Sequence, residues 1–387
     1  MRPTASLALV ALLALAGCAA VEDTAAPPAE LTDFEPAARI ERVWTDTSGD
    51  AFNRKWVRMT PSSTDGDVLY VANVAGQVSA YDREDGARRW RVDADAWLSA
   101  GVGSGAGGVY VGSSEGTVIA LDADDGSERW RRDLVTELLA PPAVASAEMV
   151  LVRAADGRVV ALSSETGETA WTYDADVPSL TLRGNSQPVP VPGGALIGLD
   201  NGRVVALEGD SGEPLWESTV APPEGGSPIE RMVDIDGALG IGQGVLYAAT
   251  YQGQIAQIEP REGEIGWSRE LSSYAGLSVD AQRVYVTDER SHVRALDPDS
   301  GTTLWRQDVL AHRRLTAPVP VPGTDYLAVA DYDGYVHLLT RGDGRLVARH
   351  RTGGFGILAD PVPLDEGRIA VQTQGAKVLV LEAAPLE

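Results

Sequence analysis

The sequence predicts an all-β fold: an eight-bladed β-propeller of four-stranded antiparallel blades, closed by an N-terminal strand that joins the last blade. Three observations predict it. One residue pattern recurs eight times, in copies beginning at residues 68, 108, 149, 195, 245, 283, 326 and 368. The tryptophans that mark the pattern are 38 to 51 residues apart, close to the length of a four-stranded blade. No segment after residue 20 has a convincing helical period.

The first element is a short apolar stretch, Ala5 to Ala16, behind the positive charge of Arg2. It is too short to cross a bilayer and has the length of the apolar part of a signal peptide. It ends in Leu15-Ala16-Gly17-Cys18, which resembles the lipobox of bacterial lipoproteins. The resemblance implies a lipoprotein signal peptide over residues 1–17 and lipid attachment at Cys18. Ala19, where an aspartate would retain the protein at the inner membrane, implies export to the outer membrane. An ordinary secretory signal is the alternative.

Residues 18–37 form the second element, between the expected lipid and the first repeat. This stretch contains Pro27-Pro28 and many alanines, and it lacks apolar periodicity. We therefore expect a flexible tether over residues 18–37 and assign residues 38–387 to the propeller.

Each repeat reads as a series of strands and turns, as residues 108–130 illustrate. A Val/Tyr-rich run predicts a buried strand, and Glu115-Gly116 supplies the hairpin turn that follows it. An alternating strand, a second turn ending in Gly126 and a last strand closing on Trp130 complete the unit.

The tryptophans have a structural explanation. A glycine stands four residues before the tryptophan in each of six repeats, and the segment Ala38–Trp44 supplies a seventh tryptophan. One tryptophan per blade predicts side chains that fill the gaps between adjacent sheets. The alternative, an aromatic ligand site, would need several of them in one pocket, whereas repetition around a ring disperses them. The repeated residues are Trp44, Trp90, Trp130, Trp171, Trp216, Trp267 and Trp305.

The end of the repeat array predicts how the ring closes. The seventh copy has Ala348 in the tryptophan position, and the eighth, Arg368 to Glu382, lacks its final strand. The segment Ala38–Trp44 has no preceding strands of its own. We therefore expect it to complete the last blade, which removes free sheet edges.

The composition disfavours several functions. The net charge of −24 disfavours binding to nucleic acids or anionic lipids, so lipid rather than a basic patch would attach the chain to a membrane. One cysteine and four histidines disfavour a transition-metal site. The acidic segment Asp122–Gly126 lacks the spacing of a calcium loop and reads as a turn. No catalytic motif is present, so we expect no enzyme, no cofactor and no metal.

The pattern Ala-Leu-Asp-x-x-x-Gly-x-x-x-Trp, at residues 120–130 and 295–305, resembles the tryptophan-docking repeat of the quinoprotein propellers. Quinoprotein alcohol dehydrogenases in this superfamily carry pyrroloquinoline quinone, calcium and a pair of adjacent cysteines. This chain has a single cysteine and no credible calcium loop. A periplasmic quinoprotein-like enzyme or ligand-binding propeller is therefore the weaker alternative.

The chain more closely resembles the propeller lipoproteins of the outer-membrane β-barrel assembly machinery. The most specific segments are residues 178–184, 230–236 and 310–318. The resemblance implies a non-catalytic scaffold that is lipid-anchored at the outer membrane, faces the periplasm and assists insertion of β-barrel proteins. It would dock on the POTRA domains of BamA, with unfolded outer-membrane proteins as further partners.

Two of those segments lie in unusually long connections. The connection from Trp171 to the next copy has 23 residues and that from Trp216 has 28, whereas the corresponding connections elsewhere have 15 to 20. Long inter-blade connections often build a binding face. By resemblance, the partner-binding residues are Leu180, Leu182, Arg183, Asp234 and Asp236. We expect exposed leucines to anchor the partner, and the three charged residues to orient it from the rim. Alternatively, the leucines face inward on a strand and Arg183 pairs with an aspartate to stabilise the loop.

Overall fold

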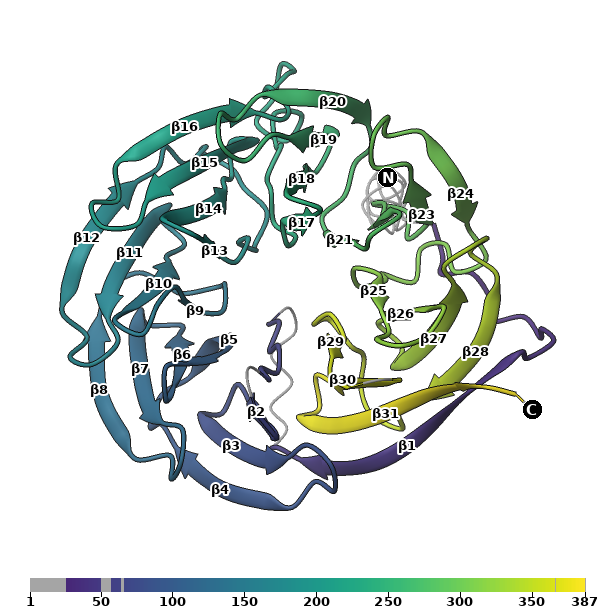
Figure 1. Cartoon of the computed structure of the whole chain (residues 1–387), viewed down its shortest axis with the longest axis horizontal. Coiled ribbons are helices and arrows are strands. Elements are labelled where there is room, and N and C mark those ends of the chain that lie inside the picture. The colour runs from purple at the N-terminus through teal and green to yellow at the C-terminus, as the bar shows by residue number, and fades with distance from the viewer. Residues whose placement is uncertain (1–25, 50–56, 64–65, 366, 387) are drawn as a thin grey trace, which may run out of the picture.

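Eight antiparallel sheets stand around a common axis, as Figure 1 shows. This computed structural model describes residues 26–49, 57–63, 66–365 and 367–386. Within these ranges all regular structure is strand, which confirms the predicted eight-bladed propeller. The predicted signal peptide and Cys18 lie outside the described residues. No helix in the described part of the chain could span a membrane.

The strands follow one another from the centre of the ring outward in most blades. The first four blades in chain order comprise β2 Val68–Ala72, β3 Gln77–Asp82, β4 Arg88–Asp93; β5 Leu98–Gly105, β6 Gly108–Ser113, β7 Thr117–Asp122, β8 Glu128–Asp133; β9 Ala143–Val144, β10 Met149–Arg153, β11 Arg158–Ser163, β12 Thr169–Asp174; β13 Val189–Val191, β14 Gly194–Gly198, β15 Arg203–Glu208, β16 Pro214–Thr219. The last four comprise β17 Gly240–Gly242, β18 Val245–Ala249, β19 Gln254–Ile258, β20 Ile265–Glu270; β21 Leu277–Val279, β22 Val284–Thr287, β23 Val293–Leu296, β24 Thr303–Gln307; β25 Val319–Pro320, β26 Tyr326–Ala330, β27 Tyr335–Thr340, β28 Leu346–Arg351; β29 Val362–Pro363, β30 Arg368–Gln372, β31 Lys377–Pro385, β1 Ala38–Thr47.

The ring closes as predicted, because β1 pairs antiparallel with β31 on the outside of the last blade. The register places Ala38 opposite Pro385 and Thr47 opposite Lys377. In the first blade, the position of an inner strand is taken by a single bridge between Ser62 and Tyr70.

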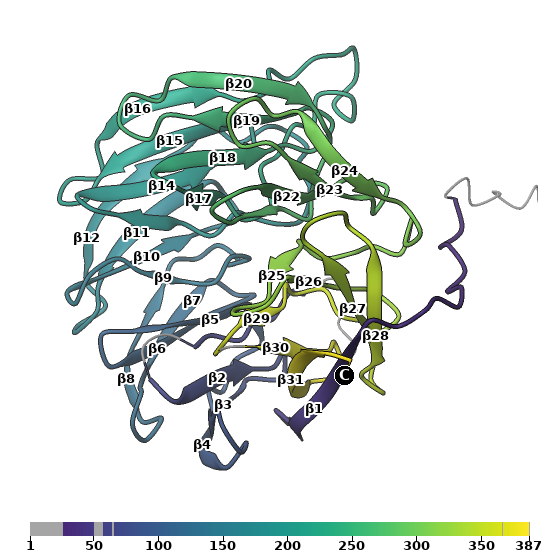
Figure 2. The same ribbon diagram turned by 45° about the vertical axis from the view of Figure 1, so that its right-hand side comes forward.

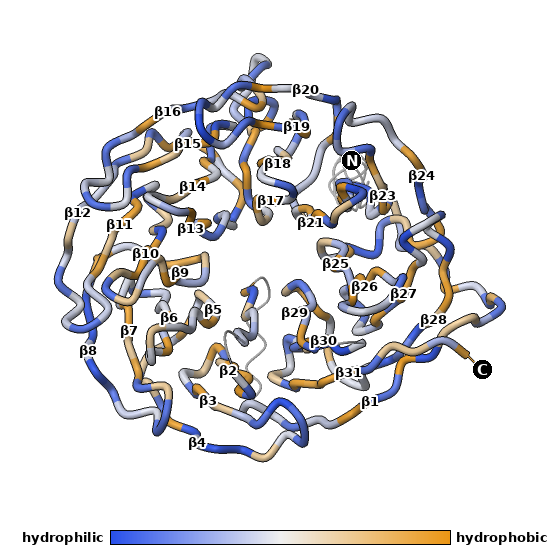
Figure 3. The backbone as a smooth tube through the Cα atoms, viewed as in Figure 1, coloured by the Kyte–Doolittle hydropathy of each residue, from blue (hydrophilic) through white to orange (hydrophobic). Residues whose placement is uncertain are grey.

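Burial follows position within the blade. The two middle strands are buried on both faces; every residue of β6, for example, is buried. The outer strands are hydrophilic, as the blue stretches of β4 and β8 in Figure 3 illustrate, and in β8 only Trp130 is buried. The core is therefore a ring of apolar clusters between neighbouring blades, one of which joins Trp130 of the second blade to Val150 and Leu162 of the third.

The repeated tryptophans join the blades, which confirms their predicted packing role. Each indole Nε1 donates a hydrogen bond of 2.8–3.0 Å to a backbone carbonyl oxygen in the next blade; that of Trp130 bonds Ser164. Each ring also covers the repeat glycine of the next blade, which in six cases stands four residues before the next tryptophan. A Cβ atom on Gly126 would lie 2.7 Å from Cε3 of Trp90. The glycine therefore leaves room for the ring of the preceding blade.

The same geometry explains why Ala348 replaces a tryptophan. The seventh blade faces the closing blade, whose two outer strands, β31 and β1, are not joined by a turn. No turn glycine is available to receive an indole there. Instead, Ala38 of β1 packs beside Val347 and Ala348, and Ala37 N–H bonds the Val347 carbonyl oxygen at 3.0 Å.

The segment before β1 differs from the expected flexible tether. Residues 26–37 contain no strand, but they run along the outside of the ring beside β28, as Figure 2 shows. Ala29 N–H bonds the Ala311 carbonyl oxygen at 2.9 Å. Leu31 and Phe34 pack on the apolar cluster around Leu310, and the Arg349 guanidinium lies 5.1 Å from the Phe34 ring centre. At least this part of the predicted tether is therefore attached to the propeller.

Candidate partner-docking site

The two long connections lie between β12 and β13 and between β16 and β17. Leu180 in the first is 40% exposed, Leu182 is partly buried, and neither lies in a strand. The structure therefore excludes the alternative in which both leucines are inward-facing strand residues. An exposed leucine beside a partly covered one is compatible with the apolar anchor that the sequence predicted.

Arg183 is exposed but paired. Its Nη1 and Nη2 atoms donate to the two carboxylate oxygens of Glu137 at 2.8 and 2.7 Å. Glu137 belongs to the connection between β8 and β9, so the pair links neighbouring connections. A two-point contact fixes the direction of the guanidinium plane, although a pair this exposed contributes only about 1 kcal/mol or less.

Asp234 and Asp236 do not lie at the rim as expected. Their exposed fractions are 0% and 6%. Oδ1 of Asp234 accepts a 3.0 Å hydrogen bond from Leu182 N–H. A Cβ atom on Gly184 would lie 2.9 Å from the Asp236 carboxylate. Both acids therefore support the first connection from beneath, where a partner at the surface would not reach them directly.

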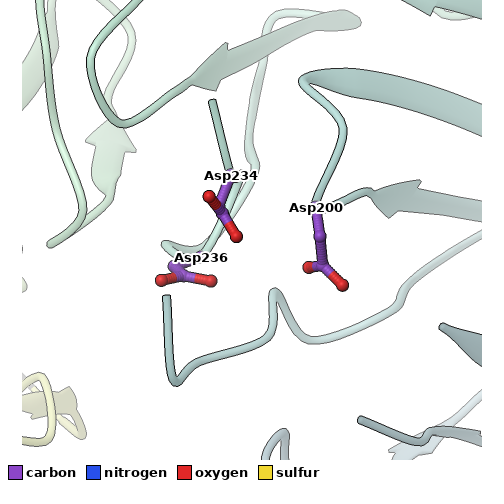
Figure 4. Close-up of side chains that lie close together, drawn as sticks. All are labelled: Asp200, Asp234 and Asp236. Atoms are coloured by element: carbon purple, nitrogen blue, oxygen red, sulfur yellow. The ribbon is translucent and has the colours of Figure 1, made fainter. Parts of the chain in front are cut away.

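A third acid completes this buried group. Figure 4 shows Asp200, which follows β14, facing Asp234 and Asp236. Arg153, at the end of β10 and fully buried, bonds Oδ1 of Asp200 through Nη2 at 2.5 Å. The Asn185 side-chain amide donates to the same oxygen at 3.3 Å.

Burial disfavours the charged form of these acids. Burial, followed by repulsion from the Asp236 charge, raises the pKa of Asp234 to about 7. Burial raises the pKa of Asp236 to about 6, although the positive charge of Arg58 acts in the opposite direction.

A cavity of about 470 Å³ opens beside the docking connection. Its walls come from six inter-blade connections and from Tyr251 in the hairpin between β18 and β19, so it lies near the axis of the ring. Charged and aromatic side chains lie among the apolar ones; they are Arg58, Arg183, Asp236, Tyr251, Tyr274, Arg314 and Asp360. The sequence offers no cysteine pair to complete a quinoprotein site here, because Cys18 is its only cysteine.

Four residues of the site were not predicted from the sequence: Glu137, Arg153, Asn185 and Asp200. One of them had a signal in the repeat. Arg153 stands four residues before a turn glycine, where other copies have a small residue such as Ala72, Gly112 or Gly198. A long cation at a small, inward position indicates a buried charge partner. Nothing local in the sequence distinguishes Glu137, Asn185 or Asp200 from ordinary turn and loop residues.

Comparison with known proteins identifies the family. The family model described as outer membrane protein assembly factor BamB matches residues 33–100, 74–293 and 289–385. The BamB proteins of Pseudomonas aeruginosa and Escherichia coli are 39% and 34% identical to this chain, over 92% and 96% of it and 93% and 96% of their own lengths.

Solved structures agree. The crystal structure of BamB from Moraxella catarrhalis matches with a TM-score of 0.80 and 29% identity, over 89% of this chain and 99% of that one. A quinohemoprotein alcohol dehydrogenase from Comamonas testosteroni matches with a TM-score of 0.69 and 16% identity, over 89% and 76%, and shares the fold. The family model and the near full-length relatives together show that this chain belongs to the BamB family of outer membrane protein assembly factors.

Proposed function

We propose that this chain is a non-catalytic scaffold of the outer-membrane β-barrel assembly machinery that docks on the POTRA domains of BamA. The contact surface would be the connection carrying Leu180, Leu182 and Arg183. Lipid at Cys18 would hold the propeller at the outer membrane, facing the periplasm. Unfolded outer-membrane proteins remain a further expected partner.

The geometry of the docking connection is the main support. Leu180 is exposed on a segment that is held at two points: Leu182 N–H by Asp234, and the Arg183 side chain by Glu137. An apolar side chain on a fixed segment loses little conformational freedom on binding, and this favours affinity. Leu182 and Arg183 also line the cavity, so a partner element could reach it from the docking connection.

Binding of residues 19–387 to the BamA POTRA domains tests the proposal. We expect saturable binding that is lost in Leu180→Ala/Leu182→Ala/Arg183→Ala. The matched control is Leu215→Ala/Leu304→Ala/Arg345→Ala, which removes the same side-chain types from exposed positions on two outer strands, β16 and β24, and on the turn between β27 and β28.

Unchanged melting of both variants would show that folding is not the cause. Equal loss of binding in both would contradict the assigned surface. Absence of binding by the unmodified chain would contradict the docking role. Absorbance of a bound cofactor in the purified protein would instead favour the ligand-binding alternative.

A further inference from the structure

The buried acids beneath the docking connection form a compact group of oxygen atoms. Asp200, Asp234 and Asp236 each offer one carboxylate oxygen, and these oxygens lie within 4.8 Å of one another. All three side chains are buried. They come from two parts of the chain, the end of β14 and the connection after β16.

The surrounding charges do not balance this group. Arg153 pairs with Asp200, and Arg58 approaches Asp236 from the cavity, where Asp360 lies as well. Asp360 is offset by Arg314, which lines the same cavity, so the three clustered carboxylates and two guanidinium groups leave one negative charge when all are ionised. A buried charge without compensation costs several kcal/mol, so the group requires either protons or further positive charge.

Unpartnered oxygen atoms favour further positive charge over protons. Oδ2 of Asp234 and Oδ1 of Asp236 are buried and have no hydrogen-bond partner among the described residues. Oδ1 of Asn185 is a third such acceptor, and its amide group is held against Asp200 by the Nδ2 contact. Asn185 is 9% exposed and carries no charge, so its buried, unpartnered oxygen beside Asp200 is an acceptor additional to the three acids. The unpartnered Nε of Arg153 nearby is a donor and cannot bind a cation.

We propose that Asp200, Asp234, Asp236 and the Asn185 amide oxygen form a binding site for one Ca²⁺ ion. Calcium binds carboxylate and amide oxygens at about 2.3–2.6 Å, so opposite ligands lie up to about 5 Å apart. Opposite ligands of Mg²⁺ are only about 4.2 Å apart and must be nearly octahedral. Because Mg²⁺ usually keeps several of its waters, a buried set of protein oxygens favours calcium.

The site lies directly under the proposed docking connection. Asp234 bonds Leu182 N–H, Gly184 rests against Asp236, and Asn185 continues the same segment. A bound ion would hold the base of this connection to the neighbouring blade and reduce its freedom before the partner arrives. This coupling rests on the proposed docking function, whereas ion binding itself does not.

Calorimetric titration of chelator-treated residues 19–387 with CaCl₂ tests the site, because this chain retains every residue that the structure describes. We expect one ion per chain and a saturable rise in melting temperature. In Asp234→Asn/Asp236→Asn the affinity should fall at least about tenfold, since two charged ligands are lost. The control Asp124→Asn/Asp299→Asn removes two exposed carboxylates elsewhere and should bind calcium as the unmodified chain does.

The calcium-dependent change is compared within each variant, so altered stability of a variant does not obscure it. Absence of heat and of a melting shift up to about 10 mM, well above the dissociation constants of weak extracellular calcium sites, would overturn the proposal. Equal responses in the unmodified chain and in the Asp234/Asp236 variant would place the ion elsewhere and also overturn it.

Binding to the POTRA domains, measured with calcium and with chelator, tests the coupling separately. Several-fold tighter binding with calcium is expected. Calcium binding without any change in POTRA binding would retain the site and refute the coupling.

Discussion

Oδ1 of Asp234 accepts a 3.0 Å hydrogen bond from the backbone N–H of Leu182, so a buried acid in one inter-blade connection holds the proposed docking segment of the connection before it. This relationship separates two kinds of residue that the sequence grouped together. Leu180 and Arg183 are exposed and able to contact a partner, whereas Asp234 and Asp236 are buried positioning residues. Their substitution should therefore affect docking indirectly.

Asp234→Ala and Asp234→Asn should differ in POTRA binding when a chelator is present. Alanine removes the acceptor for Leu182 N–H, and we expect binding to weaken about tenfold, near the lower end for a hydrogen bond to a charged group. Asparagine retains an acceptor oxygen and should bind nearly as well as the unmodified chain. Equal weakening in both variants, measured by calorimetry, would mean that the charge itself and not the hydrogen bond matters.

Gly126→Ala should destabilise the ring more than Gly193→Ala. Both glycines have positive φ, 76° and 83°, so alanine is strained by roughly 1–2 kcal/mol at either position. At Gly193 nothing lies within 4 Å of the added Cβ, whereas at Gly126 it would meet the Trp90 ring at 2.7 Å. We expect an additional loss of about 1–3 kcal/mol at Gly126 in urea unfolding. Equal losses would show that the indole yields easily and does not fix the neighbouring blade.

Phe34→Ala should release the segment before β1. The ring lies between the Arg349 guanidinium and the cluster around Leu310, and its removal should raise the hydrogen-exchange rate of the Ala29 amide. The neighbouring exposed residue provides the control, since Glu35→Ala leaves these contacts intact. An unprotected Ala29 amide in the unmodified chain would restore the interpretation of residues 26–37 as a flexible tether.

The repeat made the architecture predictable. Gly126, Trp130 and their equivalents recur at a fixed spacing, so the strands and turns assigned to one copy apply to the others. For the same reason, Ala348 could be recognised from the sequence as an exception to the tryptophan pattern. The reason for this exception lies in the three-dimensional structure. The two outer strands of the closing blade, β31 and β1, are not joined by a turn, so no turn glycine receives an indole there. The attached segment before β1 was missed because its two large apolar side chains, Leu31 and Phe34, are too few to form a periodic pattern.

The candidate site was predictable only in part. The lengths of two connections and the family resemblance marked the segments that carry the candidate site. Burial of Asp234 and Asp236 was not predicted, because a loop sequence does not indicate whether it folds over the inner ends of neighbouring blades. The pairing of Arg183 with Glu137 joins residues 46 positions apart, and nothing in the sequence ties the two together. Of the buried partners, Arg153 alone stood out against its repeat position.

Asp360 should make stability depend on pH between about 4 and 6. Its Oδ1 accepts Ala317 N–H at 2.8 Å beside the central cavity, and burial raises its pKa to about 6, against the opposing charge of Arg58. Because the folded-state pKa lies above the unfolded value, the protonated acid is favoured in the folded chain. The associated stability is complete below about pH 4 and is lost as pH rises through 6.

Asp360→Asn keeps the acceptor and removes the charge. Its free energy of unfolding, relative to the unmodified chain, should therefore increase between pH 4 and pH 7 by about 1 kcal/mol, less than the full shift implies because the side chain is partly solvent-exposed. Parallel urea unfolding at both pH values measures this difference; a constant difference would show that Asp360 ionises normally in the folded protein.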